Sequence, residues 1–380
     1  MTTDKGVWNL QQVRDKQLQS LWTYTGSATE GAQLWVWGLG PVGNNTAPSY
    51  SSPVQIPGDW KKYYNSFIKF GIKEGDTLWA WGDNTYGTLG QNNRTVYSSP
   101  IQIPGTWSAV MVGNDKDWYK SGAITTDGEL FCWGQQNGAN IVKFLDDVNY
   151  SSPVQIPGTT WKQGSWDRLA AYWTKTDGTM YALGSNMYGQ LGNNGPTGGP
   201  SWSPSSRSSP VQIPGTSWSH VSGSLALRTD GSLWTWGANE FGQLGLNAPY
   251  NGGHRSSPVQ IPGSWSEIAH GSYTRAAINT DGELFTWGYN LRGQLGINES
   301  GIWRSSPTQV GSDTTWEAVA MFGQQSRGIK TDGTLWAWGW NGNGDLGQNT
   351  NIQNYSSPVQ IPGTWLSNRL ETSYGGAIRF

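Results

Sequence analysis

The chain has 380 residues, including 53 glycines and 25 tryptophans, and its 24 basic and 26 acidic residues leave a net charge of −2. This balance lacks the positive field expected of a protein that binds nucleic acid or an anionic membrane. The single cysteine, Cys132, excludes an intrachain disulfide, and its place inside an apolar strand predicts a buried, inert thiol. No apolar run approaches the ~18 residues of a membrane span and no signal-peptide pattern is present, so we expect synthesis in a cytoplasm without secretion or membrane insertion.

Residues 1–20 differ from the rest of the chain, which is repetitive. Apolar residues with a loose helical spacing lie there between polar and charged ones: Val7, Trp8, Leu10 and Val13. The segment is interpreted either as a lead-in that packs on the body or as an arm that attaches the protein to another subunit. Residues 21–380 are predicted to form one repeat domain.

A Trp-rich strand of the form L-W-x-W-G, with some variation, recurs seven times. Its terminal glycines lie at positions 38, 82, 134, 184, 237, 288 and 339. A second signature, S-S-P-V-Q-I-P-G or a variant of it, also recurs seven times and begins at positions 51, 98, 151, 208, 256, 305 and 356. Two independent signatures, with glycines spaced by 44 to 53 residues, identify a repeat protein.

Each repeat contains four short predicted strands. A proline-bounded Pro-Val-Gln-Ile strand, suited to a solvent-facing margin, precedes a Trp-led strand and a strand of small residues. An Asp-Gly pair such as Asp332-Gly333 then predicts a two-residue type I′ hairpin turn before the Trp-rich strand. Both faces of that strand, represented by Leu335 and Trp338, are apolar and must be covered.

Seven such four-stranded antiparallel sheets, packed face to face around an axis, predict an all-β, seven-bladed β-propeller. The ring is expected to close by pairing N- and C-terminal strands, because the first Trp-rich strand lacks the two strands that precede the others. The C-terminal strands, including the segment at Trp365 and residues 375–380, are predicted to complete that blade. Residues 21–25 are a surplus strand candidate that the sequence alone does not place.

The combination T-D-G-x-L-W-x-W-G followed by N-x-x-G-Q-L-G resembles the regulator of chromosome condensation repeat. The second half stands at 84–90, 186–192, 239–245, 290–296 and 341–347, while the first and third units depart from it. The resemblance covers residues 21–380 and implies a seven-bladed propeller. The family's functions include nucleotide exchange on a small GTPase, ultraviolet sensing, inhibition of a β-lactamase and scaffolding, so fold does not choose among them. The G-W-R-H-T motifs of the plant ultraviolet-B photoreceptor do not occur here.

A second resemblance concerns the beginning of the chain. The segment 6–13, G-V-W-N-L-Q-Q-V, is similar to the start of many virion proteins of tailed phages, which begin with a G-x-W-x-L motif. Near-verbatim repeats, a charged fraction of 13% and abundant Gly, Asn, Ser and Thr are also typical of fibres and decoration proteins in such particles.

No catalytic or metal-binding pattern accompanies the repeats. His220 and His270 have no carboxylate at ligand spacing, His254 lies in a Gly-rich loop, and the nucleophile-elbow, zincin and Walker patterns do not occur. The aspartates before glycine are explained by turn geometry, although a ring of carboxylates could bind cations weakly. The chain is therefore predicted to be neither an enzyme nor a protein with a cofactor.

Variation is concentrated in seven insertions between the Trp-rich strand and Ser-Ser-Pro, which should emerge on one face of the ring. Variable loops on a rigid scaffold are where binding is usually found. The position before Ser-Ser-Pro is always Tyr or Arg, and three further aromatic residues lie in the insertions. The resulting candidates for partner binding are Tyr50, Tyr97, Tyr150, Trp202, Arg207, Tyr250, Arg255, Trp303, Arg304 and Tyr355. The alternative for the Tyr and Arg positions is stacking against a neighbouring blade.

The main functional hypothesis is a non-enzymatic virion protein of a tailed phage: a tail fibre, a tail-associated protein or a capsid decoration. Its arm would bind other virion proteins and its loop face a neighbour or a host surface glycan, with homo-oligomer formation left open. The alternative is a cytoplasmic, soluble interaction scaffold or inhibitor of the regulator of chromosome condensation-like family. Neither hypothesis includes nucleic acid, a membrane or a cofactor.

Overall fold

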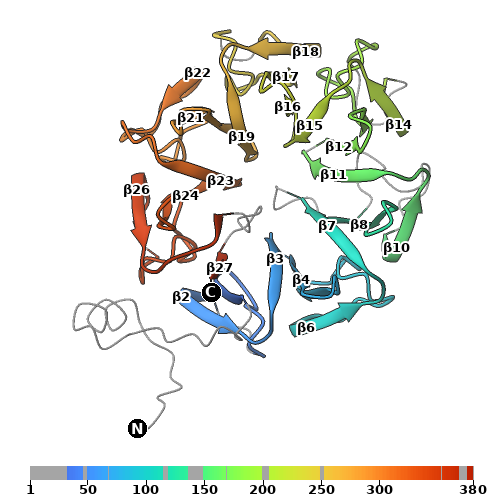
Figure 1. Ribbon diagram of the computed structural model, residues 1–380, viewed down its shortest axis with the longest axis vertical. Coiled ribbons are helices and arrows are strands. Elements are labelled where there is room, and N and C mark those ends of the chain that lie inside the picture. The colour runs from blue at the N-terminus through green and yellow to red at the C-terminus, as the bar shows by residue number, and fades with distance from the viewer. Residues whose placement is uncertain are drawn as a thin grey trace.

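The computed structural model describes residues 32–45, 49–66, 68–113, 119–135, 149–167, 169–198, 205–248, 252–351, 353–367 and 375–379. These residues form seven small antiparallel sheets arranged as a ring around a central axis (Figure 1). The prediction of an all-β, seven-bladed propeller is therefore confirmed. Among the described residues, no helix is long and apolar enough to cross a bilayer.

The sheets are numbered here as blades 1 to 7. Blade 1 contains β27 (Gly376–Arg379), β1 (Gln33–Gly38) and β2 (Tyr50–Ile56). Blade 2 contains β3 (Trp60–Asn65), β4 (Ile68–Lys73), β5 (Leu78–Gly82) and β6 (Tyr97–Ile103). Blade 3 contains β7 (Trp107–Val112), β8 (Lys120–Thr125), β9 (Leu130–Gly134) and β10 (Tyr150–Ile156). Blade 4 contains β11 (Trp161–Trp166), β12 (Ala170–Lys175), β13 (Met180–Gly184) and β14 (Arg207–Ile213).

The remaining three blades repeat the same order. Blade 5 contains β15 (Trp218–Val221), β16 (Leu225–Arg228), β17 (Leu233–Gly237) and β18 (Arg255–Ile261). Blade 6 contains β19 (Trp265–His270), β20 (Thr274–Asn279), β21 (Leu284–Gly288) and β22 (Arg304–Gln309). Blade 7 contains β23 (Trp316–Phe322), β24 (Gln325–Lys330), β25 (Leu335–Gly339) and β26 (Tyr355–Ile361).

Each blade ends with a Pro-Val-Gln-Ile strand, whereas the sequence pattern predicted that this strand begins the next blade. Each Pro-Val-Gln-Ile strand pairs with the Trp-rich strand that precedes it, as β26 pairs with β25, and forms the outer edge of that blade. An edge strand tolerates proline because one side of its backbone needs no ladder partner. The grouping of this strand with the Trp-led strand that follows it was therefore wrong, although the four strand types were correctly predicted.

Blade 1 closes the ring by joining the two ends of the chain. β27 pairs with β1, with Leu34 opposite Ile378, and the Leu366 N–H donates to the Ile378 carbonyl oxygen at 2.9 Å. The pairing of N- and C-terminal strands is thus confirmed, whereas the last Pro-Val-Gln-Ile strand belongs to blade 7. The surplus candidate at 21–25 and the arm at 1–20 lie outside the described residues.

The Asp-Gly turns are not type I′, because only the glycine takes a positive φ. Gly333 has a φ of 78°, and its N–H bonds the carbonyl oxygen of Lys330, which closes an ordinary turn before the glycine. The Asp332 carboxylate accepts hydrogen bonds from the N–H and hydroxyl of Thr334 at 2.9 and 2.7 Å. Asp177 and Asp230 bond Thr179 and Ser232 in the same way, so in these three turns aspartate acts through its side chain, and a three-residue loop replaces the predicted two-residue one.

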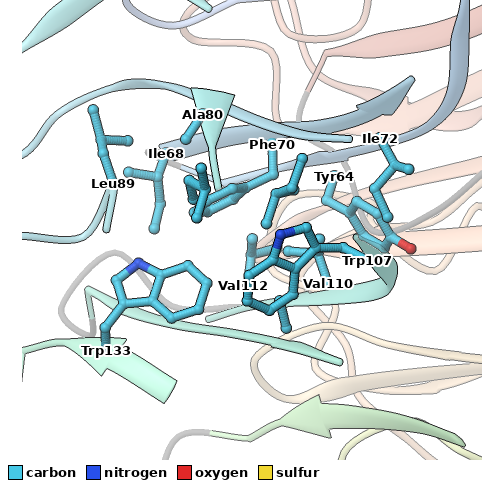
Figure 2. Close-up of a cluster of buried hydrophobic side chains, with 13 residues drawn as sticks. Tyr64, Ile68, Phe70, Ile72, Ala80, Leu89, Trp107, Val110, Val112 and Trp133 are labelled. Carbon is cyan, nitrogen blue, oxygen red and sulfur yellow. The ribbon is translucent and has the colours of Figure 1, made fainter. Parts of the chain in front are cut away.

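The core consists of a hydrophobic cluster between each pair of blades rather than one central cluster. Between blades 2 and 3, Phe70 of β4 packs against Trp133 of β9, with Trp107 and Val110 of β7 beside them (Figure 2). The expectation that both faces of the Trp-rich strand are covered is met in this way. Cys132 is fully buried on that strand, and burial raises the pKa of its thiol well above the ordinary value.

Tryptophan also joins neighbouring blades by hydrogen bonds. In five blades the indole N–H of the second Trp in the Trp-rich strand reaches a loop carbonyl of the preceding blade at 2.8–3.0 Å. The donors are Trp37, Trp133, Trp236, Trp287 and Trp338. The loops that follow the Trp-rich strands are therefore part of the ring's packing and not free appendages.

Candidate functional site

The loop face is held in place by one buried asparagine in each regular repeat. The side-chain oxygen of Asn290 accepts from the Leu295 N–H at 3.0 Å, and its amide donates to the Glu299 carbonyl oxygen at 3.0 Å. Asn84, Asn186, Asn239 and Asn341 are buried and bonded to their own loops in the same way. Each asparagine satisfies buried backbone groups, so the loop has a defined shape on which other side chains are displayed.

The Tyr and Arg positions before Ser-Ser-Pro all begin the outer strands and are half-buried. The Tyr50 and Tyr97 hydroxyls accept hydrogen bonds from Asn44 and Asn93 at 3.1 and 3.2 Å, and Tyr150 and Tyr355 pack on inter-blade clusters. These are contacts to their own loops and to neighbouring blades. A partner-binding role for these tyrosines stays a prediction.

The arginines at the same position bond their own loops. Arg207 donates to the Ser206 carbonyl oxygen, Arg255 donates to those of Gly253 and His254, and Arg304 forms an ion pair with Glu299. Their binding role is likewise a prediction. The other candidates, Trp202, Tyr250 and the arm residues Val7, Trp8, Leu10 and Val13, lie outside the described residues.

Trp303 is the predicted candidate that the structure places in an aromatic group. Its ring is stacked on Tyr289 at 6.5 Å between centroids, and edge-to-face on Phe241 at 5.7 Å. Phe241 also contacts Tyr273 and Tyr289 at 4.6 and 4.9 Å. Blades 5 and 6 thus bring together four rings from four separate stretches of sequence.

Two exposed aliphatic residues are near this group in the chain: Leu291 lies two residues after Tyr289, and Ile302 immediately precedes Trp303. Leu291, Ile302 and Trp303 are 49%, 41% and 42% exposed. We call Phe241, Tyr273, Tyr289, Leu291, Ile302 and Trp303 the aromatic patch. Half-buried rings together with exposed aromatic and aliphatic side chains nearby in the chain are a composition characteristic of protein-interaction surfaces.

Polar groups adjoin the aromatic patch toward the axis. A small pocket of about 30 Å³ is lined by Tyr273, Glu240 and the buried Arg275. Arg275 is held by Asp167 at 3.2 Å and by Ser224 at 3.0 Å, so three consecutive blades are linked by one charged network. Burial lowers the pKa of the Arg275 guanidinium, and Asp167 opposes that shift. The pocket is too small for a metabolite, and this network serves to fix the loop face.

Two of the three histidines, His270 and His254, are held by structural hydrogen bonds. His270 is buried between the Ser222 hydroxyl and the Trp166 carbonyl oxygen, each at 2.9 Å, and His254 Nδ1 accepts from the Asn239 N–H. The axial cavity is about 110 Å³, room for roughly four waters. Within the described ranges, no group of three or more His, Cys, Asp or Glu side chains could hold a metal ion.

Phe241, Tyr273, Tyr289, Leu291 and Ile302 were missed by the sequence reasoning. A signal existed for Phe241, because the N-x-x-G loops carry an aromatic at the same position in Tyr86 and Tyr188. Aligning the repeats would have shown that Tyr119 and Tyr273 also share a position, immediately before the small-residue strand. Strand pairing within blade 6 brings Tyr273 and Tyr289 to Trp303, whereas the contact of Phe241 with Trp303 depends on the packing of blade 5 beside blade 6.

Seven blades in a ring, with a Trp-to-loop hydrogen bond in five of them and asparagine-anchored loops in five, define a repeat propeller with a displayed loop face. The family described as "Regulator of chromosome condensation (RCC1) repeat" matches residues 76–115, 177–224, 230–278, 281–322 and 332–368. The chain belongs to the RCC1 repeat family, as the sequence resemblance indicated.

Several curated proteins are similar at low identity. Mouse regulator of chromosome condensation is 25% identical over 280 residues, which cover 67% of this chain and 66% of that protein. The ultraviolet-B receptor UVR8 of Arabidopsis thaliana is 26% identical over 232 residues, or 59% and 52% of the two chains. The probable E3 ubiquitin-protein ligase HERC6 of Homo sapiens is 26% identical over 238 residues, 61% of this chain but 22% of that protein. The matches thus cover between about a fifth and two thirds of these relatives.

Solved structures show the same ring. Prp20p from Saccharomyces cerevisiae superposes with a TM-score of 0.75 at 19% identity, over 89% of this chain and 87% of that one. Human WBSCR16 superposes with a TM-score of 0.73 at 18% identity, over 92% and 98%. At such identities the likeness establishes the fold. These relatives and structures come from plants, animals and yeast, and they give no support to the resemblance to phage virion proteins.

Proposed function

We propose that this protein is a non-enzymatic interaction scaffold that binds a protein partner on its loop face, with the aromatic patch at the centre of the contact. The observation that carries the proposal is the exposure of Leu291, Ile302 and Trp303 beside three further packed rings. Rigid aromatic anchors give much contact area at a small entropic cost, and they dominate the energetics of protein interfaces.

Family membership is compatible with this function but does not select the partner. The yeast protein Prp20p has described binding properties toward Gsp1p and histones. For this chain we propose only that the propeller binds a protein, without assigning it the partners of Prp20p. The net charge of −2 gives no reason to assign a nucleic-acid partner.

Site-specific photo-crosslinking in the native host tests the proposal. A photoreactive amino acid is placed at Trp303 in one variant and at Asp332 in a second. Asp332 lies in the turn at the opposite end of the strands, since Gln325 pairs with Gly339 at the loop end and Ile329 with Leu335 near the turn. We expect a discrete crosslinked partner from position 303 and none from 332; equal labelling from both positions would contradict a loop-face site.

A second candidate is that the partner is another protein of a phage particle. It rests on the near-identical Ser-Ser-Pro-Val-Gln-Ile-Pro-Gly copies and on the segment 6–13, as set out above. If the protein is part of a phage particle, it is located in the virion. If it is a cellular interaction scaffold, it is located in the cytoplasm. Mass spectrometry of purified particles separates the two, because a virion component is present at stoichiometric level and a cellular scaffold is absent.

A further inference from the structure

A lysine or arginine lies over two aromatic rings in five of the seven blades. In each case the cation is the last residue of the small-residue strand, and one ring is an aromatic of the Trp-rich strand. In blades 2, 4, 5 and 7 the other ring is the first residue of the Trp-led strand, and in blade 1 it is Trp365, which lies outside the strands. The cations lie 4.1–5.8 Å from the two ring centroids. They are Lys73, Lys175, Arg228, Lys330 and Arg379. The aromatic pair is therefore a repeated cation-binding element.

Blades 3 and 6 keep the aromatic pair without the cation. Thr125 and Asn279 occupy the position of the lysine or arginine. The rings of Trp107 and Phe131 are 5.7 Å apart and edge-to-face, and those of Trp265 and Phe285 are 5.4 Å apart and edge-to-face. Blade 4 has the same ring geometry, 5.5 Å between Trp161 and Tyr181, and there Lys175 lies over both rings. The pairs in blades 3 and 6 thus have the shape that accepts a cation.

The same two blades also acquire a carboxylate. The residue after Asp-Gly is Thr or Ser in blades 4, 5 and 7, but it is Glu129 in blade 3 and Glu283 in blade 6. Both glutamates are half-buried and lie on the strand face that carries the phenylalanine, two residues before it. Glu129 accepts a hydrogen bond from Gln155 at 3.1 Å, and Glu283 accepts one from Gln309 at 3.1 Å. In blades 3 and 6 the chain therefore lacks the lysine or arginine beside the rings and has a glutamate immediately before the first residue of the neighbouring strand.

The first Trp of the Trp-rich strand changes together with these residues. In blades 5 and 7 the indole N–H of Trp234 or Trp336 bonds the Ser232 or Thr334 hydroxyl at 2.9 Å. Phenylalanine has no such donor, so in blades 3 and 6 the hydroxyl is not needed and a glutamate takes its place. Blades 3 and 6 therefore share three differences from the other blades. The last residue of the small-residue strand is not a cation, the residue after Asp-Gly is glutamate, and the first aromatic residue of the Trp-rich strand is phenylalanine.

Open pockets lie over both unfilled aromatic pairs. One of about 500 Å³ is lined by Trp107, Thr125 and Phe131 of blade 3 together with Ile103 and Pro104 of blade 2. Another of about 710 Å³ is lined by Trp265, Asn279 and Phe285 of blade 6, with Ile261 and Pro262 of blade 5. An equivalent pocket of about 710 Å³ at blade 7 is lined by Lys330, so there the chain's own cation lies over the rings at the pocket wall.

We propose that the pockets at blades 3 and 6 bind lysine or arginine side chains of a partner protein, which occupy the place that the chain's own cation fills in the other five blades. Aromatic faces and outer-strand apolar walls line both pockets and suit the stem and head of such a side chain, and a carboxylate lies two residues before each phenylalanine on the same strand face. These pockets lie between outer strands, so the inference is independent of the aromatic patch.

The test uses acetyl-Gly-Lys-Gly-amide, with acetyl-Gly-norleucine-Gly-amide as the neutral probe of equal length, and follows the indole N–H resonances of Trp107 and Trp265 by NMR. We expect saturable shifts of both resonances with the lysine peptide only. Thr125→Lys should abolish the response at Trp107 and leave that at Trp265, and Asn279→Lys the reverse. Glu129→Gln should weaken binding at Trp107 severalfold.

Thermal melts of the same variants verify folding, and each lysine variant carries its own control in the pocket that it does not alter. Equal shifts with the norleucine peptide, or an unchanged Trp107 response in Thr125→Lys, would overturn the proposal. A neutral disaccharide such as cellobiose that shifts both resonances when the lysine peptide does not would also overturn it.

Discussion

The indole N–H of Trp338 in blade 7 donates a hydrogen bond to the main-chain carbonyl oxygen of Gln294 in blade 6, 3.0 Å away. The same Trp338 ring is fully buried and lies edge-to-face on Trp316 at 6.0 Å. One side chain therefore fills the cluster between two blades and also ties a loop of the loop face to the next blade. Stability of the ring and the shape of its binding face depend on the same contacts.

Trp338→Ala should lower the free energy of unfolding by about 3–5 kcal/mol, since it empties a buried aromatic site and leaves a loop carbonyl unpaired. Denaturant unfolding measures the loss. Trp336→Ala, at a half-buried position of the same strand, should cost less. A loss below about 1 kcal/mol for Trp338→Ala would show that this residue is not part of the core.

Trp81 and Trp287 occupy equivalent positions, but their indole groups differ in hydrogen bonding. Trp287 donates to the Gln243 carbonyl oxygen at 3.0 Å, whereas the buried Trp81 nitrogen has no partner among the described residues. The two Trp→Phe variants remove the same atoms, so Trp287→Phe should be less stable than Trp81→Phe by about 1 kcal/mol. Equal losses in denaturant melts would mean that the inter-blade hydrogen bond adds no net stability.

Lys69 should make stability depend on pH. Burial lowers the pKa of Lys69 from 10.5 to about 8, and Asp345 and Asp83 offset part of that effect. Between these values the unfolded chain binds more protons than the folded one, so the free energy of unfolding should rise with pH from about 8 to 10, by at most about 1.4 kcal/mol per pH unit.

Lys69→Met should flatten that rise, and Lys162→Met, which removes an exposed lysine, serves as the control. Urea melts at several pH values between 7 and 10 give the profile. A Lys69→Met protein that keeps the wild-type slope would show that another group is responsible.

Asn290→Ala should destabilise the loop that leads to the aromatic patch. The substitution leaves the Leu295 N–H and the Glu299 carbonyl oxygen without their buried partners, which costs about 2–3 kcal/mol. Glu299→Ala, which removes a 48% exposed side chain from the same loop, should cost under about 1 kcal/mol. Thermal unfolding that ranks the two variants in the opposite order would contradict the anchoring role of Asn290.

The repeat pattern predicted the seven blades because it depends on local chemistry that each copy repeats: an apolar Trp-rich strand, a turn and a proline-flanked edge. It did not predict which blade an outer strand joins, since a Ser-Ser-Pro strand is adjacent in sequence to both neighbours. Asp332 and Gly333 correctly marked a turn, but their backbone angles depend on the side-chain bonds of Asp332 to Thr334.

The candidate site was predictable only where a single residue broke the pattern. Trp303 is a large aromatic in a polar insertion, so the sequence identified it. Phe241 and Tyr289 follow regular Trp-rich strands in different repeats and look like repeat residues. Pairing of β21 with β22, with Gly288 opposite Arg304, brings Tyr289 to Trp303, and the packing of blade 5 beside blade 6 brings Phe241 to them. The aromatic pairs of blades 3 and 6 likewise became visible only by comparison with their filled counterparts.

The most direct test of the binding role of the aromatic patch is the dissociation constant of the crosslinked partner, measured by calorimetry. Trp303→Ala should raise it at least about 30-fold, as expected for an exposed aromatic anchor at the centre of an interface. Val96→Ser, which changes a 55% exposed residue on a loop of blade 2, should leave it within about twofold. A folded Trp303→Ala protein that binds the partner as tightly as the wild type would contradict the account.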